Sequence, residues 1–192
     1  MQELQSKLIK ALAFIHKKSQ ITDSEFEEYY ETRHAPLAQS LLNFEYYERN
    51  YINSNLCPLY PSLGSISIFK YESEKSLAIV GEQMASNAGD TLRKDELNFM
   101  HVEENFHVFT NSSEIISTKT YSKKIFLIAR DKNGLKFLDK FSCIQKISDN
   151  LIADDKKMVA IPEYGINADA TINDIELIID EFPQIILAKT IS

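Results

Sequence analysis

The chain has 192 residues, 44% of them hydrophobic and 26% charged, so it can bury a core as one large domain or two small ones. Its net charge of -7 disfavours unspecific binding to nucleic acid or anionic lipid, and we expect neither a nucleic acid nor a membrane as a partner. With two distant cysteines, no cleavable leader pattern and no apolar run long enough for a membrane span, the sequence predicts a cytoplasmic protein without a disulfide framework.

The first two predicted elements are a strand and a capped helix. The short apolar run at 8–16 favours a strand. After a polar turn, Thr22 and Glu25 have the spacing of a capping box, which predicts that a helix begins there.

The stretch from Thr22 to Leu42 contains the histidine with the best chemical setting. Phe26, Tyr30 and His34 recur every fourth residue and therefore share one face of the helix. Pro36 has no backbone N–H, so we expect the helix to kink or restart beside His34.

The elements that follow complete a βαββαβ order. In the strand predicted over 44–52, Tyr47 and Tyr51 should share one face and Tyr46 and Glu48 the other. The further predicted elements are a loop at 53–64, a strand at 65–71, a helix capped by Ser73 with Leu77, Val80 and Met84 on its buried side, a break at 87–90, helical turns at 91–99 and a strand at 105–110. This order is that of a ferredoxin-like unit, which covers one sheet face with helices and leaves the other to a second subunit, a second domain or a ligand.

Several stretches resemble the EthD-like family of the dimeric α+β barrel superfamily over about residues 8–117. They are ALAFIHKK, the helix FEEYYETRHAPL, the tyrosine strand that ends at Tyr47 to Asn50, and DELNFM with Asp95 and Phe99. Two features depart from the family pattern: Tyr30 stands where the family usually has tryptophan, and the loop at 53–64 is polar and contains two prolines.

The resemblance implies two ferredoxin-like units packed sheet against sheet, with an apolar cavity between helix and sheet in each unit. It implies little about the reaction, since relatives by fold range from cofactor-free monooxygenases and isomerases to proteins of unknown activity.

The last third of the chain has the pattern of a degenerate second unit. A strand is predicted at 124–130, a helix at 135–147 with Phe137, Phe141 and Ile144 on one face, a strand at 157–165, a helix over 172–182 and a strand at 185–191. The pattern assigns no third strand between these elements, and 175–182 would also fit a strand. Superposing the two helical stripes places Gln145 opposite His34, so the second unit keeps the packing pattern but not the histidine. We therefore predict an α+β fold of tandem ferredoxin-like units that form an α+β barrel, with domains at 1–117 and 118–192. The chain would be an internal pseudo-dimer that could also form a homodimer.

The candidate catalytic residues are His34, Tyr30 and Asp95, and the candidate substrate-binding residues are Phe26, Tyr47, Leu37, Phe69 and Phe99. A histidine titrates near neutral pH and can exchange a proton with a substrate oxygen. Each residue also has a structural alternative: His34 bonded to carbonyl groups freed at the kink, the tyrosines as core aromatics, and Asp95 as a helix cap or ion-pair member. His101, Glu103 and His107 would form a metal-like set only if their whole segment were one strand.

Three functions remain open from the sequence. No nucleophile elbow, phosphate loop, dinucleotide fingerprint or paired-cysteine site occurs, so we expect no cofactor and no metal. The first hypothesis is a cofactor-independent enzyme that acts by proton transfer on a small hydrophobic molecule, aromatic or polyketide-like, through His34. The alternatives are a ligand-binding or accessory module without catalysis, and a protein that binds haem or a metal.

Overall fold

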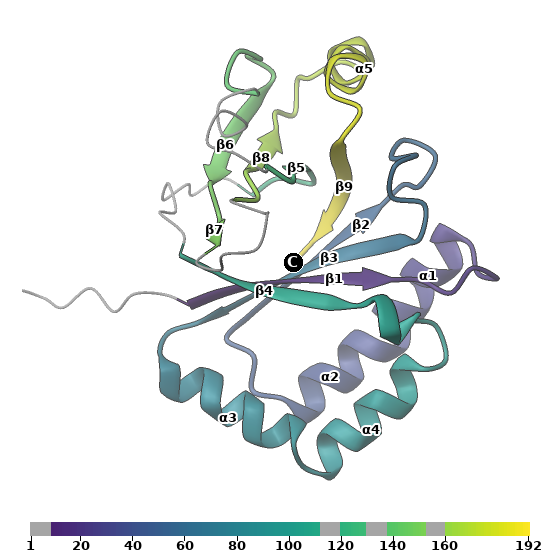
Figure 1. Cartoon of the computed structure of the whole chain (residues 1–192), viewed down its shortest axis with the longest axis vertical. Helices are drawn as coiled ribbons and strands as arrows, with labels where there is room; N and C mark the ends of the chain where they lie inside the picture. The colour runs from purple at the N-terminus through teal and green to yellow at the C-terminus, as the bar shows by residue number, and fades with distance from the viewer. Residues whose placement is uncertain (1–8, 112–119, 130–137, 153–159) are drawn as a thin grey trace, which may run out of the picture.

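The computed structural model describes residues 9–111, 120–129, 138–152 and 160–192, and these contain nine strands and five α-helices (Figure 1). In chain order the elements are β1 (Ile9–His16), α1 (Asp23–Tyr29), the π-helical turn η1 (Tyr30–His34), α2 (Ala35–Leu41), β2 (Tyr46–Ile52), β3 (Leu63–Tyr71), α3 (Glu74–Met84), α4 (Asn87–Glu96), the 3-10 turn η2 (Val102–Glu104), β4 (Phe106–Asn111), β5 (Lys123–Leu127), β6 (Ile144–Ser148), β7 (Leu151–Ile152), β8 (Glu163–Ile166), α5 (Ile172–Glu181) and β9 (Ile185–Ile191). None of these helices is both long and apolar enough to span a bilayer.

The first half of the chain is a four-stranded antiparallel sheet in the order β2-β3-β1-β4. Helices α1 to α4 lie together on one side of this sheet, and the strands of the second half lie on the other side (Figure 1). The predicted βαββαβ unit is therefore confirmed, and its second sheet face is covered by the rest of the chain.

The second half repeats the strand order of the first. Its strands are arranged β6-β8-β5-β9. Here β5, β6, β8 and β9 take the places that β1, β2, β3 and β4 have in the first half. Both halves therefore have the spatial order second, third, first, fourth strand. The tandem ferredoxin-like architecture predicted from the sequence is confirmed.

Two seams close the halves into a barrel. Strand β2 pairs with β9 from Arg49 opposite Ile191 to Ile52 opposite Ala188, and β4 pairs with β7 through Thr110 opposite Ile152. Strand β7 continues the path of β6 beyond Asn150, whose φ of 44° changes the direction of the chain. Each half thus pairs its last strand with the other half. The predicted domain limit at 117/118 lies outside the described residues.

Side chains of β2 alternate between two environments, as predicted. Tyr47 and Tyr51 belong to the aromatic cluster under α1, whereas Tyr46 packs on the core of the barrel and Glu48 forms an ion pair inside it. This alternation decides which groups can reach the helix layer and which are enclosed by the barrel.

The helix predicted over 135–147 is wrong for the described part of that range. Residues 138–140 form a turn, and Ile144–Ser148 is strand β6, which pairs with β8. The spacing of the apolar residues favoured a helix, but pairing with the antiparallel strand β8 makes this segment a strand. Gln145 lies on this strand and accepts a hydrogen bond of 2.7 Å from the Tyr121 hydroxyl, so it has no correspondence with His34. Residues 130–137 lie outside the described ranges.

Two smaller boundaries also differ from prediction. Helix α4 begins at Asn87, where we expected a break, because Ser86 caps it by accepting a hydrogen bond of 3.2 Å from the Ala88 N–H. Gly89 is required because a Cβ there would lie 1.9 Å from the Met84 carbonyl oxygen. The strand expected over 157–165 is β8, which begins at Glu163, and 157–159 are not described.

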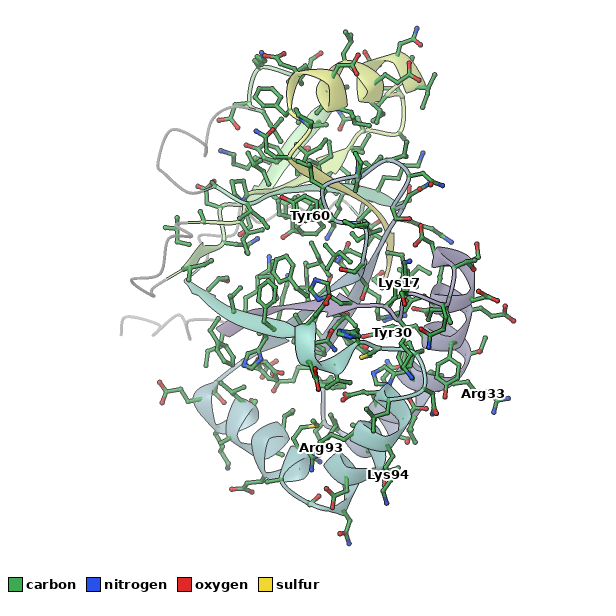
Figure 2. All side chains as sticks on the ribbon, turned by 45° about the vertical axis from the view of Figure 1, so that its right-hand side comes forward. Lys17, Tyr30, Arg33, Tyr60, Arg93 and Lys94 are labelled. Carbon is green, nitrogen blue, oxygen red and sulfur yellow. The ribbon has the colours of Figure 1, made fainter. Side chains whose placement is uncertain are left out.

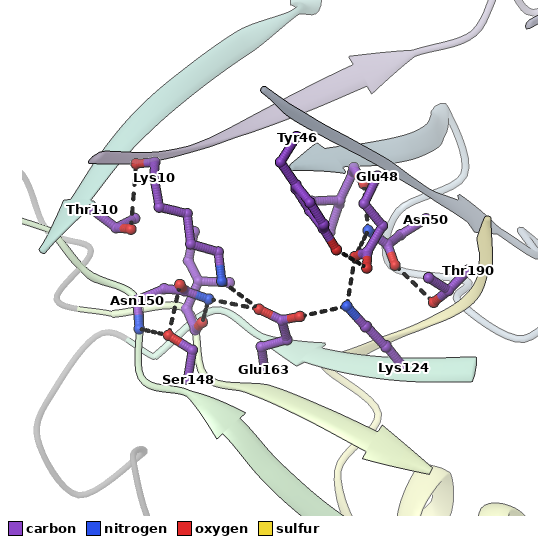
Figure 3. A network of polar contacts seen from close by, with 12 residues as sticks. Lys10, Tyr46, Glu48, Asn50, Thr110, Lys124, Ser148, Asn150, Glu163 and Thr190 are labelled. Atoms are coloured by element: carbon purple, nitrogen blue, oxygen red, sulfur yellow. Dashed lines mark hydrogen bonds and ion pairs between the residues drawn. The ribbon is translucent and has the colours of Figure 1, made fainter. Parts of the chain in front are cut away.

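A network of charged side chains lies inside the barrel, between the two halves (Figure 3). Lys10 Nζ donates to Glu163 at 2.7 Å, and Lys124 Nζ donates to Glu163 at 2.8 Å and to Glu48 at 2.5 Å. Burial alone would raise the pKa of Glu163, but the charges of Lys10 and Lys124 lower it to about 2. Asn50 joins the network to β9 through a 2.8 Å bond from the Thr190 hydroxyl. Among the described residues, two lysines and two glutamates of opposite charge meet in this network.

We expect Glu163→Gln to lower the free energy of unfolding by about 3–5 kcal/mol, because two buried lysines would lose their shared counter-charge. Urea denaturation followed by circular dichroism measures the change. The matched control is Glu181→Gln, which removes a surface ion pair with Lys140 and should cost about 1 kcal/mol or less. Equal losses in the two variants would contradict a central role for the network.

Stability should also depend on pH through Glu163. Its pKa is about 2 in the folded protein, against about 4.3 for an unfolded chain, so the ionised carboxylate stabilises the fold at pH above about 4.3. This contribution disappears as the pH falls towards 2. The unfolding free energy of the wild type should therefore fall more steeply over this interval than that of Glu163→Gln, and parallel curves would refute the assignment.

Candidate functional site

Helix α1 begins at the predicted capping box. The Glu25 N–H donates to the Thr22 hydroxyl at 3.2 Å, and the Thr22 N–H donates to the Glu25 carboxylate at 2.8 Å. One turn later Phe26 is buried against the sheet, with its ring 5.6 Å from that of Tyr30. The cap and this aromatic contact fix the rotation of the helix on the sheet.

The helix changes its winding where Pro36 was predicted to interrupt it. Residues Tyr30–His34 form the π-helical turn η1, in which the Ala35 N–H bonds to the Tyr30 carbonyl. The α-helix then restarts as α2, with Pro36 in its first turn, where a missing N–H costs little. A π-helical turn inside an α-helix is frequent at functional sites.

Asp95 connects α4 to this turn. Its Oδ2 lies 2.9 Å from Nδ1 of His34, and its Oδ1 accepts a 2.8 Å hydrogen bond from the Tyr29 hydroxyl. That hydroxyl accepts in turn from Nδ2 of Asn98 at 3.1 Å. An ionised carboxylate can only accept, so an ionised Asp95 requires the proton on Nδ1 of His34. His34, 5% exposed, is thus oriented by a carboxylate rather than by carbonyl groups freed at the kink.

The hydroxyl of Tyr30 faces the sheet. It accepts a 2.7 Å hydrogen bond from the Tyr47 hydroxyl and lies 3.1 Å from the Ser67 hydroxyl. Burial raises the pKa of both phenols, and the pKa of Tyr47 lies well above its usual value. The pair therefore stays protonated at neutral pH and ties the helix to the sheet.

Aromatic rings occupy the layer between α1 and the sheet, where the family resemblance implied a cavity. Phe99 lies 5.4 Å from Phe26, 5.5 Å from Tyr30 and 5.2 Å from His34, measured between ring centroids. Phe26, Tyr30 and Phe99 are each buried to 98% or more. These contacts bring four of the predicted site residues together as a packed cluster.

The other predicted binding residues lie beside this cluster. Phe69 stacks on Tyr47 with the ring centroids 4.8 Å apart. Leu37 is half-buried on α2 and packs towards a separate apolar group that includes residues of α2, α3 and α4 and of strands β1 and β3. Their assignment to substrate binding stays a prediction.

A cleft of about 650 Å³ opens on the outer side of α1 and η1, away from the sheet. Asp95, Tyr29 and Leu37 all line it, together with Glu25, Glu28, Thr32 and Arg33. Asp95 therefore contacts His34 on one side and reaches solvent through the cleft on the other. A small molecule in this cleft would meet Asp95 and Tyr29 side by side.

The metal-like set suggested by the sequence does not form. Val102–Glu104 is the 3-10 turn η2 and His107 lies on β4, so His101, Glu103 and His107 do not share one strand face. His101 instead lies 3.4 Å from Glu104 at the surface. Within the residues that the structure covers, no three His, Cys, Asp or Glu side chains could together hold a metal ion.

Tyr29 is the residue that sequence reasoning missed. It precedes His34 by five residues, which is the span of a π-helical hydrogen bond, whereas an α-helical bond spans four. The helical pattern placed Tyr30 on the buried face and gave no reason to select its neighbour. Pro36, which predicted an irregular turn, was the available signal.

Comparison with known proteins supports the fold and no specific family. No family model matches the chain, and no curated protein matches its sequence. A proposed monooxygenase from Fusobacterium nucleatum subsp. nucleatum superposes with a TM-score of 0.55 at 6% identity, covering 98% of this chain and 94% of that one. An anthrone oxidase-like protein superposes with a TM-score of 0.53 at 8% identity, covering 97% and 92%.

The alignment with an EthD family protein from Bacillus halodurans covers 53% of this chain and 95% of the Bacillus protein, at 18% identity and a TM-score of 0.39. The resemblance to that family continues to rest on the sequence stretches around His34. The structure and the full-length superpositions show that this chain has the fold of the dimeric α+β barrel proteins, with both units in one polypeptide.

Proposed function

We propose that the chain is a cofactor-independent enzyme that moves a proton on a small hydrophobic molecule, with Asp95 and His34 as the working pair. One observation carries the proposal: Asp95 lines an open cleft while each of its oxygens contacts a different donor, His34 on one side and Tyr29 on the other. A carboxylate held in this way at the wall of a cleft is a positioned general base.

The proposed step is a simple proton abstraction. An acidic C–H or O–H of the bound molecule loses its proton, a carboxylate oxygen of Asp95 is the final acceptor, and the electron pair stays on the molecule as an enolate or phenolate. The N–H of His34 continues to bond the second carboxylate oxygen and holds its orientation. Leu37 offers the molecule an apolar contact, and Arg33 brings a positive charge to a cleft wall that also carries the carboxylates of Glu25 and Glu28.

A non-catalytic binding or accessory role is the second candidate, and a specific observation favours it. The aromatic cluster of Phe26, Tyr30 and Phe99 occupies the layer in which the family resemblance implied a cavity. Under this alternative the outer cleft binds a ligand without chemistry, and the carboxylate–histidine pair stabilises the helix packing.

Turnover separates these candidates. In D2O, the protein should accelerate hydrogen–deuterium exchange at the acidic carbon of hydroxylated acetophenones or of 1,3-cyclohexanedione, followed by proton NMR. Asp95→Asn and His34→Gln should each reduce kcat/KM by about 10²- to 10⁴-fold, the range for loss of general acid–base catalysis. Circular dichroism and thermal melting check that each variant is folded. Binding without exchange would leave the binding module as the better account, and full activity in Asp95→Asn would refute the assignment of Asp95 as the base.

The carboxylate–phenol contact can be tested without a substrate. Burial and the bonded carboxylate of Asp95 raise the pKa of Tyr29. Asp95→Asn should move this pKa back towards its usual value, because a negative charge beside the phenolate is removed. NMR of tyrosine labelled with ¹³C at the ζ carbon reports each titration.

Tyr71 is the internal control, since burial and the charge of Glu45 raise its pKa to about 12 independently of Asp95. A Tyr29 titration that is unchanged in Asp95→Asn would contradict the proposed contact. A shift of both tyrosines would indicate a general disturbance of the fold.

A further inference from the structure

We propose that Tyr29 is a catalytic residue that carries the proton between the bound molecule and Asp95. The inference rests on the proposed function and assigns a role to a residue that neither the sequence pattern nor the comparisons single out.

The hydroxyl of Tyr29 is positioned for this role by two hydrogen bonds, and the side chain lies beside the cleft. It donates to Oδ1 of Asp95 at 2.8 Å, it accepts from Nδ2 of Asn98 at 3.1 Å, and its side chain lines the outer cleft. Its ring stacks on Phe99 with the centroids 4.7 Å apart and the planes at 30°. Phe99 is 1% exposed, so the phenol rests on a fixed surface.

The π-helical turn brings Tyr29 and His34 to the same carboxylate. In an α-helix, residues five apart point about 140° away from each other, since each residue turns the helix by about 100°. Closure of η1 by a hydrogen bond from the Ala35 N–H to the Tyr30 carbonyl widens the turn, so that residues five apart point in more similar directions than they do in an α-helix. As a result, Tyr29 binds one oxygen of Asp95 and His34 binds the other.

The adjacent Tyr30 could not perform the same task from its position. Its hydroxyl is directed into the sheet, between Tyr47 and Ser67, and the residue is 2% exposed. Tyr29 is half-buried and lines the cleft. The two neighbouring tyrosines thus divide into one that anchors the helix and one that can meet a ligand.

The step balances as a concerted transfer of two protons. The bound molecule gives its proton to the oxygen of Tyr29, whose own proton passes to Oδ1 of Asp95. Tyr29 is a neutral phenol before and after the step, Asp95 becomes a neutral carboxylic acid, and the bound molecule keeps the electron pair. The reverse transfer returns the proton to product.

The test compares Tyr29→Phe with Tyr60→Phe in the full chain, with the exchange assay on hydroxylated acetophenones and 1,3-cyclohexanedione. Tyr29→Phe retains the ring on Phe99 and loses only the hydroxyl, whereas Tyr60→Phe removes a hydroxyl that bonds the Gln184 carbonyl in another part of the molecule (Figure 2). We expect kcat/KM to fall about 10- to 100-fold in Tyr29→Phe and to stay within about twofold in Tyr60→Phe.

The pH profile distinguishes a chemical role from a structural one. In Tyr29→Phe the low-pH limb of kcat/KM should move to higher pH, because the carboxylate has lost a hydrogen-bond donor. Incorporation of 3-fluorotyrosine at position 29 retains the hydroxyl with a more acidic phenol, and it should restore most of the rate with a displaced profile.

The outcomes distinguish the two proposals. If Asp95→Asn is inactive while Tyr29→Phe matches the wild type in rate and pH profile, the role of Tyr29 is refuted and the proposed function stands. If Asp95→Asn remains fully active, the proposed function is refuted. If the wild type accelerates exchange of none of the probes, both proposals fall together.

Discussion

The ion pairs inside the barrel fix how the two halves of this chain fit together. Lys10 and Glu48 belong to the first half, and their counter-charges Glu163 and Lys124 belong to the second. A slip of one residue in a seam would turn these side chains to the wrong face and leave charges buried without partners, which is costly. The register of the seams therefore depends on this network. The helix layer with Asp95 depends on it in turn, since α1 rests on the sheet that the seams hold.

Much of the first half could be predicted from local chemistry. The capping box at Thr22, the irregular turn before Pro36 and the two faces of β2 all follow from side chains that act on their own backbone or on immediate neighbours. His34 and Asp95 could also be selected, and the structure brings them into contact. Such features need no knowledge of distant parts of the chain.

The parts that could not be predicted depend on distant partners. The segment of β6 has helical spacing, and only the presence of β8 makes it a strand. Lys10 and Lys124 lie in apolar strands, and nothing local indicates that a glutamate between them would keep both inside the barrel. Tyr29 was missed for a related reason: its contact with Asp95 requires a helical turn with one residue more than the usual periodicity assumes.

The seam between β2 and β9 also has a consequence for how the chain folds. Its paired residues Asn50 and Thr190 are 140 positions apart, and Lys10 and Glu163 are separated by 153. Contacts of such high sequence separation form late, because a long loop must close before they add stability. Until then the first sheet exposes two unpaired edges and an apolar face, which are sites of aggregation. The yield of refolding should therefore fall as the protein concentration rises, even though the folded barrel itself is stable.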